Sequence, residues 1–409
     1  MESLSKCLDA PSTPGATTAI ATTALATIAL MTLTRYALWP SSKPTVIRGP
    51  LTTYIPRLSR AEREKVTYSP DYYPGARDVV TPYGNIHVYE YGPEDGRKVL
   101  FIHGISTTCM TMQDIARPLA EKGCRVMLFD LFGRGYSDAP GDLEYDTRLY
   151  VTQILLVLAS SKLSWTGEAG LSIVGYSLGG GIAANFAAAF PHMVETLVLL
   201  APAGLIRPEN IGRASRLIFT TGLVPERLLA RLTKWRLRQP IDRAVSKRAR
   251  RPSSSSSSLA VAAVRQAIEG GDESVFDAAA QEAVDPNDDN EEALPQGPTP
   301  FERTVEGVVH WTLDNHDGFV PAFMSTIRSA PMMGQHEHWR QLARRKPGTT
   351  AVLLGRHDQL VQKDDYAEDA LPLLGGGDNV FWRVVPGAHN FPFTHAPQAL
   401  ECLYEFWGM

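Results

Sequence analysis

The sequence contains only four cysteines in 409 residues (Cys7, Cys109, Cys124 and Cys402), and their spacing fits neither a zinc site nor a small disulfide-bonded domain. This scarcity favours a reducing compartment. No Asn-x-Ser/Thr glycosylation sequon occurs, which agrees with a chain that faces the cytosol. The net charge is −4, so the chain lacks the basic excess of a nucleic-acid-binding protein, and we predict no nucleic-acid partner.

Charged residues are also absent from residues 10–34. Within this stretch, residues 16–33 (ATTAIATTALATIALMTL) are long enough to cross a bilayer, although threonine makes them only mildly apolar. Basic residues follow, and the positive-inside rule then places the globular part in the cytosol. We therefore predict an N-terminal membrane anchor in the endoplasmic reticulum or another endomembrane. A signal peptide of a secreted protein, a mitochondrial transit peptide and a disordered leader are the alternatives.

Apolar runs of strand length alternate with segments of helix length along the rest of the chain. Two runs joined by turn residues, at 78–81 and 86–92, predict a β-hairpin. Six further runs are rich in Val, Leu and Ile and lie at 99–104, 125–130, 171–175, 196–202, 349–355 and 381–387. Such continuous runs are typical of parallel strands buried on both faces. We predict an α/β fold with a mostly parallel, eight-stranded, doubly wound sheet.

One long interruption of this alternation predicts an inserted cap or lid. The expected organisation is an N-terminal segment (1–40), a connector (41–76), the first part of the core (77–205), the cap (206–344) with a serine-rich and acidic loop (252–300), and the second part of the core (345–409). We expect the cap, the serine tract and the N-terminal segment to determine substrate choice.

The first part of the cap is basic, with thirteen Lys and Arg against three acidic residues in 207–251. Helical spacing in PERLLARLTKWRLR (225–238) puts Arg227, Arg231, Lys234 and Arg238 on one face and Leu228, Leu229, Leu232 and Trp235 on another. A basic amphipathic helix suits an anionic membrane surface. The alternative is a solvated helix that packs its Leu/Trp stripe on the core.

The segment SIVGYSLGGG (172–181) places one serine at the junction between an expected strand and an expected helix. Gly175, Ser177 and Gly179 form the pattern G-x-S-x-G. In such a turn the serine takes a strained backbone conformation, and only very small residues fit two positions to either side. We predict that Ser177 is a nucleophile and that Gly175 and Gly179 make room for it.

A serine hydroxyl needs a base to take its proton, and the base needs an acid to orient it. In open α/β sheets functional groups gather at the carboxyl ends of the strands. Asp358 follows the run at 349–355 and His389 follows the run at 381–387, which gives the chain order Ser, Asp, His. We predict these two as acid and base. Asp364 and Asp365 are alternative acids, and His357 and His395 alternative bases.

Acyl transfer also requires backbone N–H groups that stabilise the oxyanion. We predict these donors to be the amides of Leu178, after the nucleophile, and Ile105, after the run at 99–104. His103 is expected to brace this second loop rather than to act as a base. His336 and His338 are only two residues apart in the cap, so we predict no metal, and the mechanism needs no cofactor.

Together these residues resemble the serine-nucleophile branch of the α/β-hydrolase superfamily. The resemblance rests on HG at 103–104, DLFGRGYSD at 130–138, GYSLGG at 175–180, GRHD at 355–358 and GAH at 387–389, and it covers about 77–205 and 345–409. It implies the α/β-hydrolase fold with a large inserted cap. Ser177 differs from the aspartate nucleophile of epoxide hydrolases and haloalkane dehalogenases, and threonine at 394 breaks the HxxxxD pattern of acyltransferases.

With its expected anchor and basic cap segment, the chain is similar to membrane-bound monoacylglycerol lipases and related esterases. The resemblance implies a serine hydrolase that cleaves small, hydrophobic, lipid-like carboxylic esters and associates with membranes. Thioesterases, carbon–carbon bond hydrolases and haloperoxidases share the triad, and a hydrolase-fold protein that only binds a ligand is the alternative without catalysis.

Overall fold

The computed structural model describes residues 14–38, 44–167, 170–208, 225–238 and 299–409. Contacts divide the chain into residues 1–43 and residues 44–409. The first unit contains one helix, α1 (Pro14–Leu38), in which the hydroxyls of Thr27, Thr32 and Thr34 donate to carbonyl oxygens one turn earlier. No helix in the described part of the chain is long and apolar enough to cross a membrane. The helix expected near residues 16–33 therefore forms, but the prediction that it is a membrane anchor is not supported.

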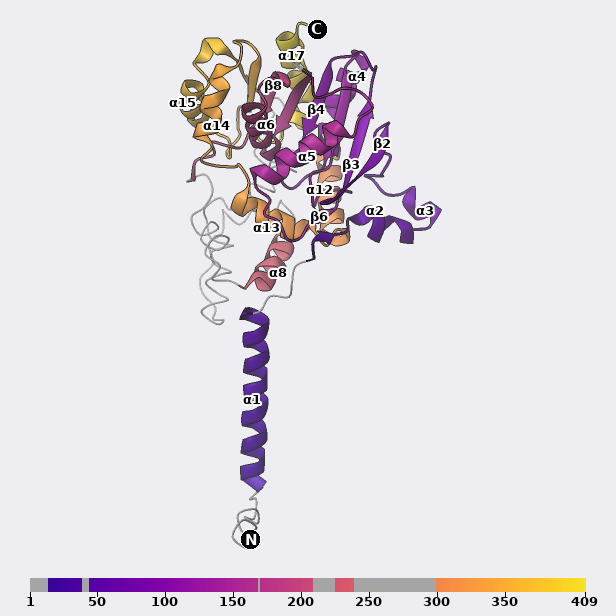
Figure 1. The fold of residues 1–409 in the computed structure, drawn as a ribbon, viewed down its shortest axis with the longest axis vertical. Coiled ribbons are helices and arrows are strands. Elements are labelled where there is room, and N and C mark those ends of the chain that lie inside the picture. Colours follow the sequence, from indigo (N-terminus) through magenta and orange to yellow (C-terminus); the bar gives the residue numbers. More distant parts are fainter. Residues whose placement is uncertain (1–13, 39–43, 168–169, 209–224, 239–298) are drawn as a thin grey trace. The chain divides into compact units, whose positions relative to one another are not determined.

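The second unit is built on the predicted eight-stranded sheet (Figure 1), with the strand order β10-β9-β8-β7-β4-β5-β3-β2. The strands are β2 (Ala76–Thr81), β3 (Gly84–Tyr91), β4 (Lys98–Ile102), β5 (Arg125–Phe129), β7 (Leu171–Tyr176), β8 (Val194–Leu200), β9 (Thr350–Gly355) and β10 (Val380–Val385). β3 runs antiparallel to both of its neighbours, β2 and β5, and the other strand pairs of this described sheet are parallel. The hairpin and the six later runs of the sequence all form strands, so the mostly parallel sheet is confirmed.

Helices cover both faces of this sheet. On one face α4 (Gln113–Glu121) packs against α17 (Ala396–Trp407), and on the other α5 (Thr147–Ala159), α6 (Leu178–Ala189), α14 (His336–Gln341) and α15 (Lys363–Leu373) form a contiguous row. Every residue of β7 and β9 is buried. Burial on both faces explains why these strands read as continuous apolar runs rather than as alternating patterns. The fold is therefore doubly wound, as predicted.

The connector before the sheet is attached to the core. Its short strand β1 (Val46–Ile47) pairs with β6 (Ala139–Pro140), and α2 (Pro50–Thr53) and α3 (Arg60–Arg63) follow. The buried carboxylate of Asp138 accepts hydrogen bonds from the Gly49 N–H (2.7 Å) and from Arg48 (2.8 Å). Short 3₁₀ helices lie at Ile55–Arg57, Cys109–Met112, Leu342–Arg344 and Gly377–Asn379. The domain boundaries drawn from the sequence stay a prediction.

Three described helices of the cap region, α8 (Glu226–Leu237), α12 (Pro300–Asn315) and α13 (Phe319–Ser329), contact one another and lie beyond the carboxyl ends of the strands (Figure 1). In α8, Leu229 is buried, whereas Leu228 and Trp235 are each 43% exposed. The Leu/Trp stripe is thus only partly packed on the protein. The predicted serine-rich and acidic loop (252–300) lies almost wholly outside the described residues.

Candidate active site

The turn between β7 and α6 holds Ser177 in a backbone conformation that residues other than glycine rarely adopt, with φ 53° and ψ −120°. Backbone hydrogen bonds hold it there. The Ser177 N–H donates to the Leu200 oxygen (3.0 Å), and the Ser177 carbonyl accepts from the N–H groups of Gly180 (2.9 Å) and Ala203 (2.8 Å). The surrounding strands and helix therefore offset the strain and fix the direction of the hydroxyl.

The two glycines of the motif, Gly175 and Gly179, lie where neighbouring backbone segments come very close to them. A Cβ atom at Gly175 would lie 2.3 Å from the Gly179 carbonyl oxygen, and one at Gly179 would lie 2.1 Å from the Ile102 oxygen. Neither position can accept a side chain without moving backbone, so both glycines are needed to pack the start of α6 against β7 and β4.

Ser177, His389 and Asp358 form one hydrogen-bonded chain in the structure. The distance from the Ser177 Oγ to the His389 Nε2 is 2.9 Å, and that from the His389 Nδ1 to the Asp358 Oδ2 is 2.8 Å. The second oxygen, Oδ1 of Asp358, accepts from the Leu360 and Val361 N–H groups at 2.9 and 2.8 Å. All three side chains are buried. The proton therefore sits on Nδ1, leaving Nε2 able to accept the serine proton.

The alternative acids and bases do not join this chain. The Asp364 carboxylate pairs with Lys363 (2.7 Å) and Asp365 pairs with Arg207 (2.8 Å). The Nδ1 of His395 contacts the hydroxyl of the neighbouring Thr394 at 3.1 Å. His357 is half-buried, and its backbone N–H donates to the Gly387 carbonyl.

The loop after β4 brings the Ile105 N–H into a fixed orientation through His103. The Nε2 of this buried histidine accepts from the Leu131 N–H (2.9 Å), so its Nδ1–H donates to the Gly104 oxygen (2.9 Å). That oxygen belongs to the same peptide group as the Ile105 N–H, and fixing one end orients the other. Burial, with the nearby Arg134 cation, lowers the pKa of His103 to about 3, so the ring stays neutral. His103 thus braces the loop.

The second expected donor, the Leu178 N–H, lies in the first turn of α6. Amides at this position have no carbonyl partner within the helix, and the helix dipole makes the site favourable for negative charge. Together, the buried serine, the His389 imidazole that is hydrogen-bonded to it and the two backbone amides have the chemistry needed to transfer an acyl group.

Comparison with known proteins finds serine hydrolases among the similar chains. A family model described as serine aminopeptidase, S33, matches residues 93–282. A serine hydrolase-like protein of Dictyostelium discoideum is 37% identical over 122 residues, 29% of this chain and 33% of that protein. The 2-hydroxymuconate semialdehyde hydrolase of a Pseudomonas strain is 32% identical over 119 residues, 29% of this chain and 40% of that enzyme. The matches thus span well under half the length of these relatives.

A solved membrane phospholipase A, a bacterial virulence factor, has the same fold, with a TM-score of 0.55 over 81% of this chain and 85% of that one at 18% identity. The chain therefore has the α/β-hydrolase fold, and neither the reaction nor the bond that is cleaved follows from the fold.

The chain also contains polar residues around its candidate site that sequence reasoning missed. Asp130 is fully buried, and its carboxylate accepts from the Tyr68 hydroxyl (3.0 Å) and from the N–H groups of Cys109 (3.2 Å) and Tyr136 (2.9 Å). Burial raises the pKa of Asp130 above its ordinary value. Asp130 therefore connects the connector, through Tyr68, with the segment after β4, through Cys109, and with its own loop, through Tyr136. An acid at a strand end, just before two glycines, was the available signal.

A second missed pair joins the cap region to the loop that carries His389. The buried carboxylate of Glu302, in the first turn of α12, accepts from the Asn390 Nδ2 at 2.8 Å and from the Thr299 N–H at 2.7 Å. Thr299 and Glu302 form a capping box, which T-x-x-E in the sequence indicates. The contact with Asn390 had no sequence signal.

His336 and His338, the two closely spaced histidines of the sequence, lie on α14. Among the residues that the structure describes, no group of three or more His, Cys, Asp or Glu side chains is arranged to hold a metal ion.

Proposed function

We propose that this α/β-hydrolase cleaves carboxylic esters, with lipid-like esters such as monoacylglycerols as the preferred class, through an acyl-enzyme on Ser177. The observation that supports the proposal most strongly is the continuous hydrogen-bonded chain from the Ser177 Oγ through His389 to Asp358. A protein that only bound a ligand would not need an imidazole 2.9 Å from a serine held in a strained turn.

In the proposed mechanism the Ser177 Oγ attacks the ester carbonyl while the His389 Nε2 takes its proton. Asp358 accepts the hydrogen bond of Nδ1–H and stabilises the imidazolium that forms. The N–H groups of Ile105 and Leu178 stabilise the oxyanion of the tetrahedral intermediate. His389 then protonates the leaving alcohol. Water, activated by the same imidazole, hydrolyses the acyl-enzyme and releases the carboxylic acid and Ser177.

Carbon–carbon bond hydrolysis is the alternative that one comparison favours, since one relative is a 2-hydroxymuconate semialdehyde hydrolase. Two substrate series separate the possibilities: p-nitrophenyl esters of increasing acyl length with matched thioesters, and a vinylogous diketone from ring cleavage. We expect ester hydrolysis to be fastest and to rise with acyl length. Turnover of the diketone with no ester turnover would contradict the proposal. A rate of ester hydrolysis that does not change with acyl length would contradict the preference for lipid-like esters.

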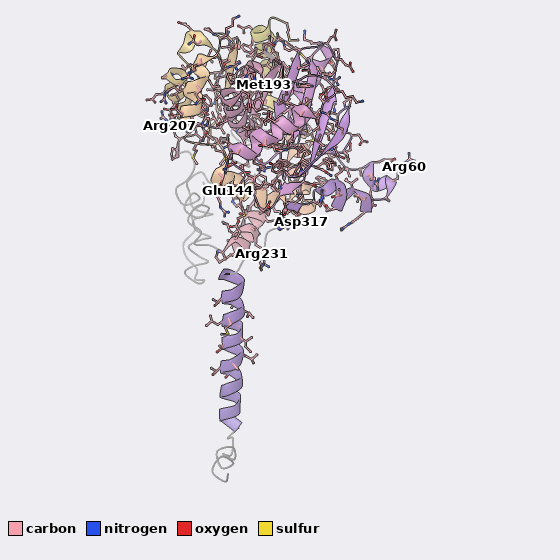
Figure 2. All side chains as sticks on the ribbon, viewed as in Figure 1. Arg60, Glu144, Met193, Arg207, Arg231 and Asp317 are labelled. Atoms are coloured by element: carbon pink, nitrogen blue, oxygen red, sulfur yellow. The ribbon has the colours of Figure 1, made fainter. Side chains whose placement is uncertain are left out.

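We further propose that α8 brings the protein to anionic lipid on the cytosolic side of an endomembrane. Arg231 (Figure 2), Leu228 and Trp235 are all exposed on α8, so this helix combines positive charge with exposed apolar area. We expect the full chain to float with vesicles containing phosphatidylserine more than with neutral vesicles, and Arg231→Glu to reduce this binding. Arg60→Glu, at an exposed cation on α3, is the matched control. Equal binding by the two variants would contradict the proposal.

A further inference from the structure

Arg134 is a fully buried cation close to the site. It follows β5 in the loop at 130–138, and its side chain is among the largest with no exposed surface. A charge removed from water is costly unless the protein satisfies it. Within the described ranges no carboxylate pairs with Arg134; oxygens of uncharged groups accept its hydrogen bonds instead. Such an arrangement suits a residue whose hydrogen bonds have to be directional.

The partners of Arg134 come from different parts of the chain. Its Nε donates to the Ile105 oxygen at 3.0 Å, and its Nη2 donates to the Thr326 hydroxyl of α13 at 2.9 Å. Its Nη1 donates to the Phe132 oxygen at 3.0 Å and to the Tyr150 hydroxyl at 3.4 Å. One side chain therefore connects the loop that carries the proposed oxyanion donor with a helix of the cap.

Two hydroxyls around Arg134 form a network in which each hydroxyl has an acceptor. The Thr326 hydroxyl donates to the Ala322 oxygen (2.7 Å), so the Tyr150 hydroxyl, 2.8 Å away, donates to Thr326. Tyr150 in turn accepts from Arg134. Since all of these groups are buried, removing one hydroxyl leaves a buried donor without its partner.

Close backbone packing keeps α13 near this loop. Gly133, next to Arg134, has φ 76°, and a Cβ atom there would lie 2.3 Å from the Ala322 Cβ. The loop and the helix therefore touch directly, and a shift of α13 changes the position of Thr326 relative to Arg134.

We propose that Arg134 is a positioning residue that couples the seating of cap helix α13 to the geometry of the oxyanion loop. His103 fixes the peptide before Ile105 and Arg134 fixes the carbonyl after it, so the Ile105 backbone is held from both sides. When α13 is displaced, Arg134 loses its Thr326 partner and the loop is held from one side only. The inference rests on the proposed function for its effect on rate, but not for its effect on the loop.

The test compares Thr326→Val with Thr312→Val in the full chain. Thr312 is also a buried threonine of the cap, but its hydroxyl donates only to Val308 of its own helix at 2.8 Å. For Thr326→Val we expect kcat for a p-nitrophenyl ester to fall about tenfold with little change in KM, because small misplacements of oxyanion donors cost rate rather than binding. Arg134→Lys keeps the charge but loses the planar, forked arrangement of N–H donors, and we expect it to lower kcat at least as much.

Amide hydrogen exchange of the peptide containing residues 103–106 is measured on the same variants without substrate. The proposal predicts faster exchange in Thr326→Val and not in Thr312→Val. It is overturned if the two variants agree in kcat, if exchange is unchanged, or if exchange rises while kcat does not fall. If wild-type protein hydrolyses no ester, the proposed function fails, and hydrogen exchange alone then decides whether Arg134 couples cap and loop.

Discussion

The sheet and its covering helices are held together mainly by buried apolar side chains, whereas the described cap helices α12 and α13 also contact the core through buried polar groups. The polar contacts are Glu302 with Asn390, Thr326 with Arg134, and His316 with the Ser137 carbonyl. Apolar packing is non-directional, while hydrogen bonds have a fixed geometry. The comparison indicates that the core provides the reactive groups and that polar contacts set where the cap lies over them.

The largest expected effect comes from the core. Ser177→Ala removes the proposed nucleophile, and we expect kcat for ester hydrolysis to fall by about 10⁵-fold or more. Initial rates with a p-nitrophenyl ester measure this, with circular dichroism as the check on folding. His389→Ala and the double variant should be about as inactive, because the two residues act as a unit. Residual activity within about a hundredfold of wild type would contradict the assignment.

Asp358→Asn tests the orientation of the imidazole. An amide at this position favours the wrong tautomer of His389, and we expect kcat to fall by about 10⁴-fold while substrate binding is retained. Asp364→Asn is the matched control, because that carboxylate is exposed and pairs only with Lys363. A similar loss of rate in both variants would show that the two acids are not distinguished in the way that the structure indicates.

The corresponding change at the cap is Glu302→Gln. The amide keeps the shape of the side chain but cannot accept from both Asn390 and the Thr299 N–H, so we expect the free energy of unfolding to fall by about 1–3 kcal/mol. We also expect kcat to fall severalfold, because Asn390 adjoins His389. Glu306→Gln, one turn further along α12, is the control in chemical denaturation and rate assays. Equal effects of the two substitutions would show that the contact between Glu302 and Asn390 contributes neither to stability nor to rate.

A pH-dependent effect on stability concerns His316, whose Nε2–H donates to the Ser137 oxygen and whose Nδ1 accepts from the Gly318 N–H. Burial lowers the pKa of His316 to about 4, below its ordinary value of 6.5. The unfolded chain therefore binds a proton that the folded chain does not between pH 6.5 and 4. The contribution of neutral His316 to the free energy of unfolding is fully present above pH 6.5. It falls by about 1.4 kcal/mol per pH unit for each such histidine as the pH drops from 6.5 towards 4.

His316→Asn should be less stable than wild type at pH 7 but should lose stability less steeply between pH 6.5 and 4. Urea denaturation at several pH values measures both slopes. His103, whose pKa is lowered to about 3, contributes the same sign and remains in the variant, so part of the slope persists. Parallel slopes for the two proteins would contradict the assignment to His316.

The contrast between the apolar core and the polar contacts of the cap also explains which features could be predicted from the sequence. Strands buried on both faces leave continuous apolar runs, and the strained turn at Ser177 leaves its glycines, so the sheet and the positions of Ser177, Asp358 and His389 at its strand ends follow from local patterns. Arg134 and Thr326 are separated by 192 positions, and nothing local links them. The membrane anchor was predicted from length and lack of charge at residues 16–33, and no described helix is long and apolar enough to support it.

The most direct test of the central claim is to locate the adduct after the full chain reacts with a fluorophosphonate probe. Peptide mapping by mass spectrometry is predicted to find the phosphonyl group on Ser177, and to find no adduct in Asp358→Asn at times when wild type is fully modified. A modified residue other than Ser177, or no adduct on folded wild-type protein, would contradict the claim that Ser177, His389 and Asp358 act as one nucleophilic unit.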